Sequence, residues 1–88
     1  MVLDMHAEST HSLKDKRHVV TSLREKLKHQ FNISIIESDY QDLWQKIQLT
    51  IAMVANTKTI IEKTFAQIED FVDLNYPVRI ISINQEYI

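Results

Sequence analysis

Asp39 and Asp42 are the residues of this chain whose type and spacing come closest to a catalytic pair. Two carboxylates held near each other can serve as a general acid and a general base. The same aspartates, on either side of Tyr40 and Gln41, are also typical of a turn, because aspartate accepts hydrogen bonds from nearby backbone amides. We favour the turn, since no serine lies in a nucleophile-elbow pattern and the chain has no cysteine. The sequence therefore predicts no enzyme and no cofactor.

The histidines, at positions 6, 11, 18 and 29, do not have the spacing of metal ligands. His11 and His18 stand seven residues apart, and no third ligand type lies nearby in the sequence. The absence of cysteine excludes thiolate zinc sites and iron–sulfur clusters, and the absence of glycine excludes the glycine-rich loops that hold phosphates. We therefore expect no metal site and no nucleotide-binding loop.

Positive charge is concentrated in one segment of the chain. Positions 14–29 have a balance of +4 and the remaining positions a balance of −6, so that the net charge of −2 combines a basic segment with an acidic body. The cations of the segment are Lys14, Lys16, Arg17, Arg24, Lys26 and Lys28. Such a segment predicts either contact with a polyanion or a solvated basic face of a helix.

The chain carries no sequence feature of a membrane or exported protein. No apolar stretch approaches the roughly 18 residues of a membrane-spanning helix. Residues 1–8 have neither the basic nor the apolar region of a signal peptide. We therefore expect a cytoplasmic protein without membrane contact, folded as a single domain over residues 1–88.

The spacing of apolar residues changes along the chain between a period of two and a helical period. Alternating or β-branched runs predict strands at 2–8, 31–38, 46–53 and 78–84, the first of them ended by Ser9 and Thr10. Helical spacing predicts helices at 12–30 and 57–74.

The residues at the ends of these elements refine the prediction. Ser12 and Asn56 are expected N-caps, and Asn75 is expected in the left-handed position after the second helix, before Pro77. The last strand has apolar residues of both parities, which predicts either a bulge or a covered second face.

The order β-α-β-β-α-β predicts a ferredoxin-like α+β fold, a two-layer sandwich of a four-stranded antiparallel sheet with two helices on one face. The right-handed crossover rule makes the first two strands parallel and places the third between them. One end of the domain then gathers residues 11–17, 37–44 and 74–77.

This end of the domain predicts an anion-binding rim. Ser12 and the amides of the first helical turn would donate to the anion, because a helix N-terminus attracts negative charge. The alternative is a capped helix whose solvated basic face forms salt bridges with carboxylates of the hairpin. The candidate residues are His11, Ser12, Lys14, Lys16, Arg17 and Arg24 on the helix side, and Asp39, Gln41, Asp42 and Trp44 on the hairpin side.

Trp44 has two interpretations. It could stack a base or fill a partner's pocket, but at the start of a strand we favour a role in closing the open end of the core. The RNA-recognition fold of the same topology places aromatic residues on its central strands, and this chain has none at the matching positions. Any RNA contact is therefore expected through the basic helix. The positions of this chain that correspond to the aromatic positions of the RNA-recognition fold are Asp4, His6, Glu8, Lys46, Gln48 and Thr50.

Two blocks of the sequence resemble the YlxP-like family, known as domain of unknown function 503. The blocks are HSLKDKR at 11–17 with VVTSLREKL at 19–27, and FNISIIESDYQDLWQK at 31–46. The resemblance implies a ferredoxin-like fold, and the family's genes in bacteria often lie among genes for translation initiation and ribosome maturation. Members of the family often carry Pro-Gly in the first strand-to-helix turn, where this chain has Glu8 and Ser9.

We therefore expect a non-enzymatic binding module that contacts ribosomal RNA or the ribosome through the basic helix and the adjacent hairpin, with no DNA partner. Two alternatives stay open. The first is a homo-oligomer, such as a homodimer, that uses an open sheet face carrying Ile36, Ala52 and one parity of the last strand. The second is a sensor of small anions.

Overall fold

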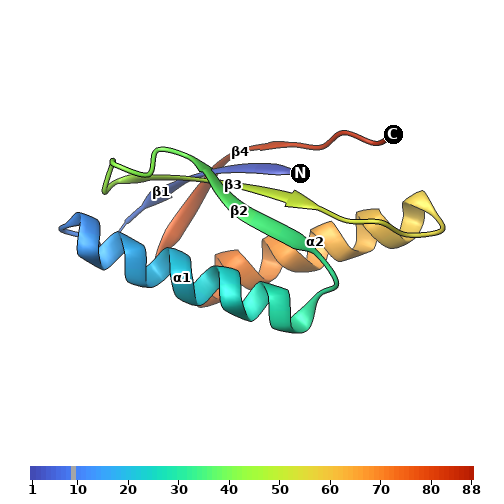
Figure 1. Ribbon diagram of the computed structural model, residues 1–88, viewed down its shortest axis with the longest axis horizontal. Coiled ribbons are helices and arrows are strands. Elements are labelled where there is room, and N and C mark those ends of the chain that lie inside the picture. The colour runs from blue at the N-terminus through green and yellow to red at the C-terminus, as the bar shows by residue number, and fades with distance from the viewer. Residues whose placement is uncertain (9) are drawn as a thin grey trace.

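The computed structural model describes residues 1–8 and 10–88, and its elements follow the predicted order (Figure 1). Ser9, which was expected to end the first strand, lies outside the described residues. The elements are β1 (Val2–Ala7), α1 (Leu13–Gln30), β2 (Ser34–Asp39), β3 (Lys46–Ala52), α2 (Lys58–Asn75) and β4 (Val78–Asn84).

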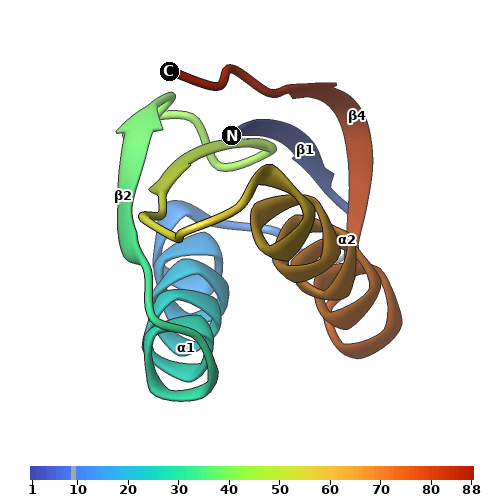
Figure 2. The same cartoon turned by 90° about the vertical axis from the view of Figure 1, so that its right-hand side faces the viewer.

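The four strands form one antiparallel sheet in the order β2-β3-β1-β4. Since β1 and β2 both pair antiparallel with β3, they run parallel to each other with β3 between them, as predicted. Figure 2 shows both helices under one face of the sheet, α1 below β2 and α2 below β4. The fold is therefore the predicted ferredoxin-like α+β sandwich.

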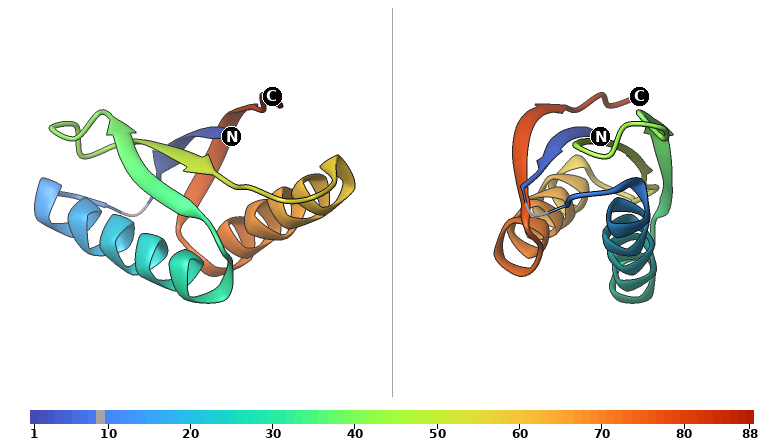
Figure 3. Two further views of the ribbon diagram at one scale, coloured as in Figure 1. Left: turned by 45° about the vertical axis from the view of Figure 1, so that its right-hand side comes forward. Right: turned by 90° about the vertical axis from the view of Figure 1, so that its left-hand side faces the viewer.

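The molecule is elongated, with extents of 41 × 21 × 18 Å. Figure 3 shows the helices arranged as a V under the sheet, with the starts of α1 and α2 at opposite ends of the long axis. The two helix N-termini therefore belong to different surfaces, and only the start of α1 lies near the β2–β3 hairpin.

One parity of each central strand faces the helices and is buried. Leu3 and Met5 on β1 are 0% and 1% exposed, and the apolar stripes of the two helices cover them. Each buried side chain of this size stabilises the fold by about 1.5–3 kcal/mol. The other core residues include Val20, Leu23, Leu27, Ile47, Leu49, Ile51, Phe65, Ile68 and Val72.

Both outer strands of the sheet contain a bulge. Asp4 pairs with Ser82 and Met5 with Ile80, so that Ile81 is an extra residue in β4. The extra residue shifts the parity of the strand, which explains why apolar residues occupy both parities and confirms the predicted bulge. A second bulge lies at Ser38 in β2, where the register shifts between residues 37 and 39.

A row of polar side chains crosses the face of the sheet that the helices leave open. Asp4 accepts hydrogen bonds from Gln48 Nε2 at 2.9 Å and from Ser82 Oγ at 3.0 Å. Ser38 Oγ donates to Gln48 Oε1 at 2.9 Å and accepts from Thr50 Oγ1 at 2.7 Å. This polar row links all four strands and satisfies its own donors and acceptors across the middle of the open face.

The N-cap of α1 is confirmed and that of α2 is displaced by one residue. The Ser12 side chain accepts a hydrogen bond from Asp15 N at 3.1 Å. The cap of α2 is Thr57, whose Oγ1 accepts from Ile60 N at 3.3 Å, and the expected cap Asn56 lies outside the helix. Asparagine and threonine are both favourable N-cap residues, so the sequence alone did not determine which of the two neighbours caps α2.

The prediction of a left-handed Asn75 is wrong. Asn75 is the last residue of α2, and its Nδ2 donates to Phe71 O at 2.8 Å. The next residue, Tyr76, is extended, with φ −132°. Pro77 explains the difference, because a proline disfavours helical backbone in the residue before it and favours an extended one. The chain therefore passes directly from α2 towards β4.

No helix among residues 1–8 and 10–88 is both long and apolar enough to cross a membrane.

Glu69 provides a test of the packing of α2. It is half-buried, and burial raises the pKa of its carboxyl above 4.5, with a smaller contribution from Asp70. Between these two pKa values the folded chain binds more protons than the unfolded chain, so stability falls as the pH rises through that interval. We expect Glu69→Gln to raise the free energy of unfolding at neutral pH and to leave it unchanged near pH 3, where the carboxyl is protonated in both states.

Urea denaturation at the two pH values measures this effect. Glu25→Gln, at an exposed position of α1, is the control for loss of a helical carboxylate. The prediction is wrong if Glu25→Gln gives the same gain at neutral pH, or if the gain from Glu69→Gln persists in acid.

Candidate functional site

The start of α1 and the β2–β3 hairpin lie together at one end of the domain, as the topology predicted. Thr10, only 4% exposed, donates from its Oγ1 to Trp44 O at 2.8 Å. Ala7 N donates to Gln45 O at 2.9 Å. These bonds fasten the second arm of the hairpin to the residues that lead into α1, and we call the resulting surface the hairpin end.

Lys16 departs most from its expected environment. We expected it on the exposed basic face, but its side chain is 1% exposed. Its Nζ lies 3.0 Å from Glu37 Oε2 and donates a hydrogen bond to Tyr40 O. The contact with Glu37 is an ion pair without a directed hydrogen bond, since Oε2 has no hydrogen-bond partner within the described residues. Lys16 therefore cross-links α1 to the hairpin and is not an exposed ligand for anions.

Helical geometry explains the burial of Lys16. It stands four residues before Val20, in line with Leu23 and Leu27, so it occupies a position of the buried stripe. Glu37 pairs with Leu49, whose side chain is in the core, so the carboxylate also faces the helices. Lys16 was predicted to be exposed because of its charge, and Glu37 was not among the candidate residues, although the helical and strand periods place both side chains on buried faces.

The turn of the hairpin depends on the same ammonium group. Tyr40 has φ 63° and is the one non-glycine residue with positive φ in the described ranges. This conformation costs an L-residue about 1–2 kcal/mol. Tyr40 O accepts from Leu43 N at 3.0 Å as well as from Lys16 Nζ, so two donors hold the turn in place. A chain without glycine thus forms a tight turn with a strained tyrosine.

The polar residues of the hairpin have turn-stabilising contacts. Asp39 Oδ1 accepts from Tyr40 N at 2.7 Å, and Gln41 Nε2 donates to Glu37 O at 3.1 Å. Asp42 is exposed. Neither aspartate forms an ion pair with α1 within the described residues, and the only helix cation paired to this region there, Lys16, uses Glu37.

Four cations of α1 line up on one side of the helix. Lys14, Arg17, Arg24 and Lys28 are separated by three, seven and four residues, which places them within one stripe at 100° per residue. We call this the basic stripe. None of the four forms an ion pair in residues 1–8 and 10–88, and Arg24 Nε is buried without a hydrogen-bond partner there.

The opposite side of α1 packs towards α2. Ser22 Oγ lies 3.1 Å from the hydroxyl of Tyr76, and Lys26 Nζ lies 5.7 Å from the centre of the Tyr76 ring. Tyr76 immediately follows α2. The basic stripe therefore faces away from the neighbouring helix. Lys14, Arg17 and Lys28 are exposed, whereas Arg24 is half-buried.

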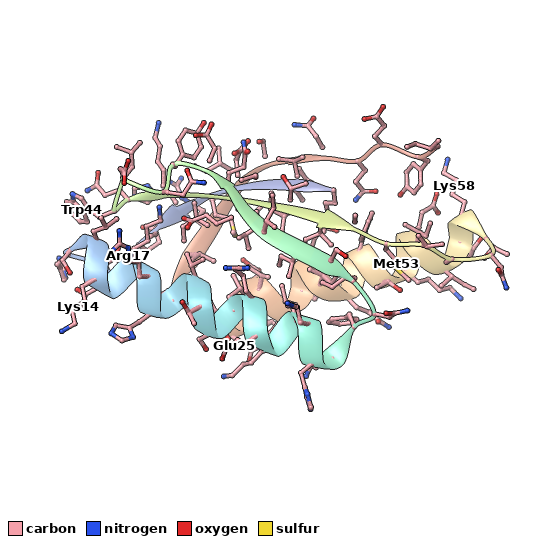
Figure 4. All side chains as sticks on the ribbon, in the orientation of Figure 1. Lys14, Arg17, Glu25, Trp44, Met53 and Lys58 are labelled. Atoms are coloured by element: carbon pink, nitrogen blue, oxygen red, sulfur yellow. The ribbon has the colours of Figure 1, made fainter. Side chains whose placement is uncertain are left out.

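Trp44 is on the surface of the hairpin end and does not close the core. It is 39% exposed, and its neighbour Leu43 is 48% exposed. The expected core position is not observed, because Trp44 belongs neither to the hydrophobic core nor to the partly buried residues packed against it. Figure 4 shows Trp44 at the same end of the molecule as Lys14 and Arg17.

The two remaining candidates, His11 and Ser12, are exposed and belong to the capping arrangement of α1. His11 N donates to Asp15 Oδ2 at 3.3 Å, while Ser12 accepts from Asp15 N. The Ser12 hydroxyl, which was expected to donate to an anion, here accepts from Asp15 N as part of the helix cap. The hairpin end thus brings together Lys14, Arg17 and Trp44 as accessible side chains, with Arg24 farther along the helix.

Most of the sequence matches a known family. The family model described as "Protein of unknown function (DUF503)" matches residues 1–85. The chain belongs to this family. It is also similar to the uncharacterized protein YlxP of Bacillus subtilis (strain 168), with 37% identity over 62 residues, which cover 70% of this chain and 67% of the relative. The DUF503 match includes α1, the hairpin and the buried Lys16–Glu37 pair.

A separate cavity of about 970 Å³ lies at the opposite end, between the start of α2 and the residues after β4. Met1 and Tyr87 line it, and Lys58 Nζ lies 4.7 Å from the centre of the Tyr87 ring. Burial lowers the pKa of the Met1 amine and raises that of Tyr87. None of the predicted site residues lines this cavity, and no cluster of metal-ligating side chains occurs among the residues that the structure describes.

The buried pair makes a direct prediction for stability. Lys16→Met removes the ammonium, leaves Glu37 at 16% exposure without a cation, and removes a donor from Tyr40 O. We expect the free energy of unfolding, measured by urea denaturation, to fall by roughly 3 kcal/mol.

Two further variants control this experiment. Lys58→Met breaks an exposed pair with Glu62, 3.8 Å apart, and is expected to change the free energy by less than about 1 kcal/mol. Lys16→Met combined with Glu37→Leu removes both buried charges and is expected to recover most of the loss. Equal small effects of Lys16→Met and Lys58→Met would contradict a structural role of the buried pair.

Proposed function

We propose that this DUF503 protein is a non-enzymatic RNA-binding module that contacts ribosomal RNA through the basic stripe and the hairpin end. The observation that carries the proposal is the stripe itself, in which four cations on one side of α1 have no internal ion pair among the described residues. A chain that is acidic elsewhere would otherwise be expected to neutralise them.

The length of the stripe fits an extended polyanion better than a small anion. Lys14 and Lys28 are separated by about 21 Å along the helix axis, at 1.5 Å per residue. Several successive phosphates of one RNA strand fit along this length, and each neutralised phosphate contributes to affinity by releasing counterions. A small anion would contact only one end of such a stripe.

The open face of the sheet supports a route through the helix. The central strands carry the polar row there, with Asp4 and Gln48 bonded to each other, and no aromatic platform of the RNA-recognition type. The gene neighbourhood implied by the YlxP-like resemblance, among genes for translation initiation and ribosome maturation, favours the same class of partner.

The proposal predicts a strong dependence of RNA binding on salt and on three exposed cations. The variant Lys14→Gln/Arg17→Gln/Lys28→Gln is expected to weaken binding to a labelled ribosomal RNA fragment at least tenfold at about 100 mM salt. The slope of log K against log salt should fall by about 2, at roughly 0.7 per lost contact on a single strand. Fluorescence anisotropy over a salt series measures both quantities.

A variant of equal charge change elsewhere is the control. Lys58→Gln/Lys63→Gln/Arg79→Gln removes three cations from α2 and β4 and is expected to bind RNA like the wild type. If both triple variants bind with the same affinity, or if the α1 variant sediments with ribosomal particles as the wild type does, the proposed interface is wrong. Lys16 is left unchanged in this experiment because its loss would disturb the hairpin.

Self-association through the open sheet face stays a prediction. Ile36 on β2 is 56% exposed, Ala52 at the end of β3 is exposed, and Ile81 at the bulge of β4 is 58% exposed, with the polar row between the β2 and β4 residues. They do not form one continuous apolar patch, so we do not propose this face as the functional surface. Light scattering at tens of micromolar gives the oligomeric state, and a stable dimer would reopen the question.

A further inference from the structure

We propose that Trp44 is a stacking platform for an unpaired base, so that the hairpin end selects RNA in which a single-stranded nucleotide adjoins the phosphates bound by the basic stripe. This inference rests on the proposed function and specifies its substrate class. Its starting point is the 39% exposure of Trp44, at a position where the sequence had predicted a buried residue.

The backbone at Trp44 is held by hydrogen bonds, and the residue is partly exposed to solvent. The carbonyl accepts from Thr10 Oγ1 at 2.8 Å, and Thr10 itself is buried. The next residue, Gln45, is bonded through its carbonyl to Ala7 N at 2.9 Å. An exposed aromatic side chain on a fixed backbone costs little entropy to order, so its surface is well suited to stacking.

The charges around Trp44 favour RNA as its partner. Lys14 and Arg17 belong to the basic stripe and lie at the same end of the molecule as Trp44 (Figure 4). Base stacking on an aromatic residue next to a cationic track is the usual arrangement for binding single strands. In a continuous duplex the bases are already stacked on one another, so only the phosphates could bind. Trp44 therefore adds affinity for a single strand and none for a duplex.

The chain has one tryptophan, so its fluorescence reports on Trp44 alone. The experiment compares a single-stranded RNA with a duplex RNA of the same length, at low salt, for the wild type and the variants Trp44→Ala, Trp44→Phe and Leu43→Ala. We expect the single strand, and not the duplex, to quench the tryptophan emission of the wild type. Trp44→Ala should bind the single strand roughly tenfold more weakly or worse, and Trp44→Phe should retain most of the affinity.

The controls distinguish stacking from nonspecific hydrophobic binding and from misfolding of the variants. Leu43→Ala removes a neighbouring exposed apolar side chain that has no aromatic face, and it is expected to bind both RNAs like the wild type. Binding of the duplex should be the same for all four proteins, which also shows that the variants are folded.

The outcomes distinguish this inference from the proposed function. Suppose that the wild type binds both RNAs, that its tryptophan emission does not change on binding, and that Trp44→Ala binds the single strand as tightly as the wild type. Stacking on Trp44 is then refuted, and binding through the basic stripe stands. Equal weakening by Leu43→Ala and Trp44→Ala also refutes stacking. If the wild type binds neither RNA at low salt, both proposals fail, and a protein partner would become the occupant to seek.

Discussion

The ammonium group of Lys16 lies buried beside the carboxylate of Glu37, and the arrangement of the hairpin end follows from that ion pair. Removing two charges from water is costly, and an apolar pair would serve packing as well or better. What an apolar pair would not supply is a donor to Tyr40 O, which holds the strained turn of the hairpin. One side chain of α1 thus contacts both the strand and the turn of the hairpin, and together with the bonds from Thr10 and Ala7 it fixes the hairpin relative to the helix. The basic stripe and Trp44 keep their relative position because both are fixed to elements that this contact joins.

Within α1, separate sides of one helix have separate tasks. The buried stripe, which includes Lys16, packs against the sheet, and the side with Ser22 and Lys26 contacts Tyr76 after α2. These contacts fix the orientation of the helix, so the basic stripe is presented to solvent in a defined direction. On the open face of the sheet, the side chains of the polar row form hydrogen bonds that join the strands to one another. The side chains that maintain the fold are therefore distinct from the side chains proposed to bind RNA.

The sequence predicted the fold well because antiparallel strands with one buried face must alternate, and alternation at 2–8 and 46–53 survives in the buried parity of β1 and β3. It predicted which segments meet at the hairpin end for the same reason, since topology alone brings α1 and the hairpin together. It did not predict which charges face inward. Lys16 was predicted to be exposed because it is charged, and Trp44 was predicted to be buried because tryptophan at the start of a strand usually is. Tertiary contacts determine the burial of both residues. Asn75 shows a third limit, because Pro77 controls the backbone there and outweighs the preference of asparagine for left-handed geometry.

The bulges at Ser38 and Ile81 have a consequence for how the protein behaves in a crowded solution. Ser38 lies in β2 and Ile81 in β4. These are the two edge strands, whose outer backbone groups have no neighbouring strand in the sheet. A straight, regular edge is a template on which another chain can add a strand, and this is a common start of aggregation. An extra residue twists the edge and interrupts the regular spacing of its free amides and carbonyls. The same irregularities that adjust the parity of side chains within the sheet therefore also discourage the sheet from growing beyond its four strands.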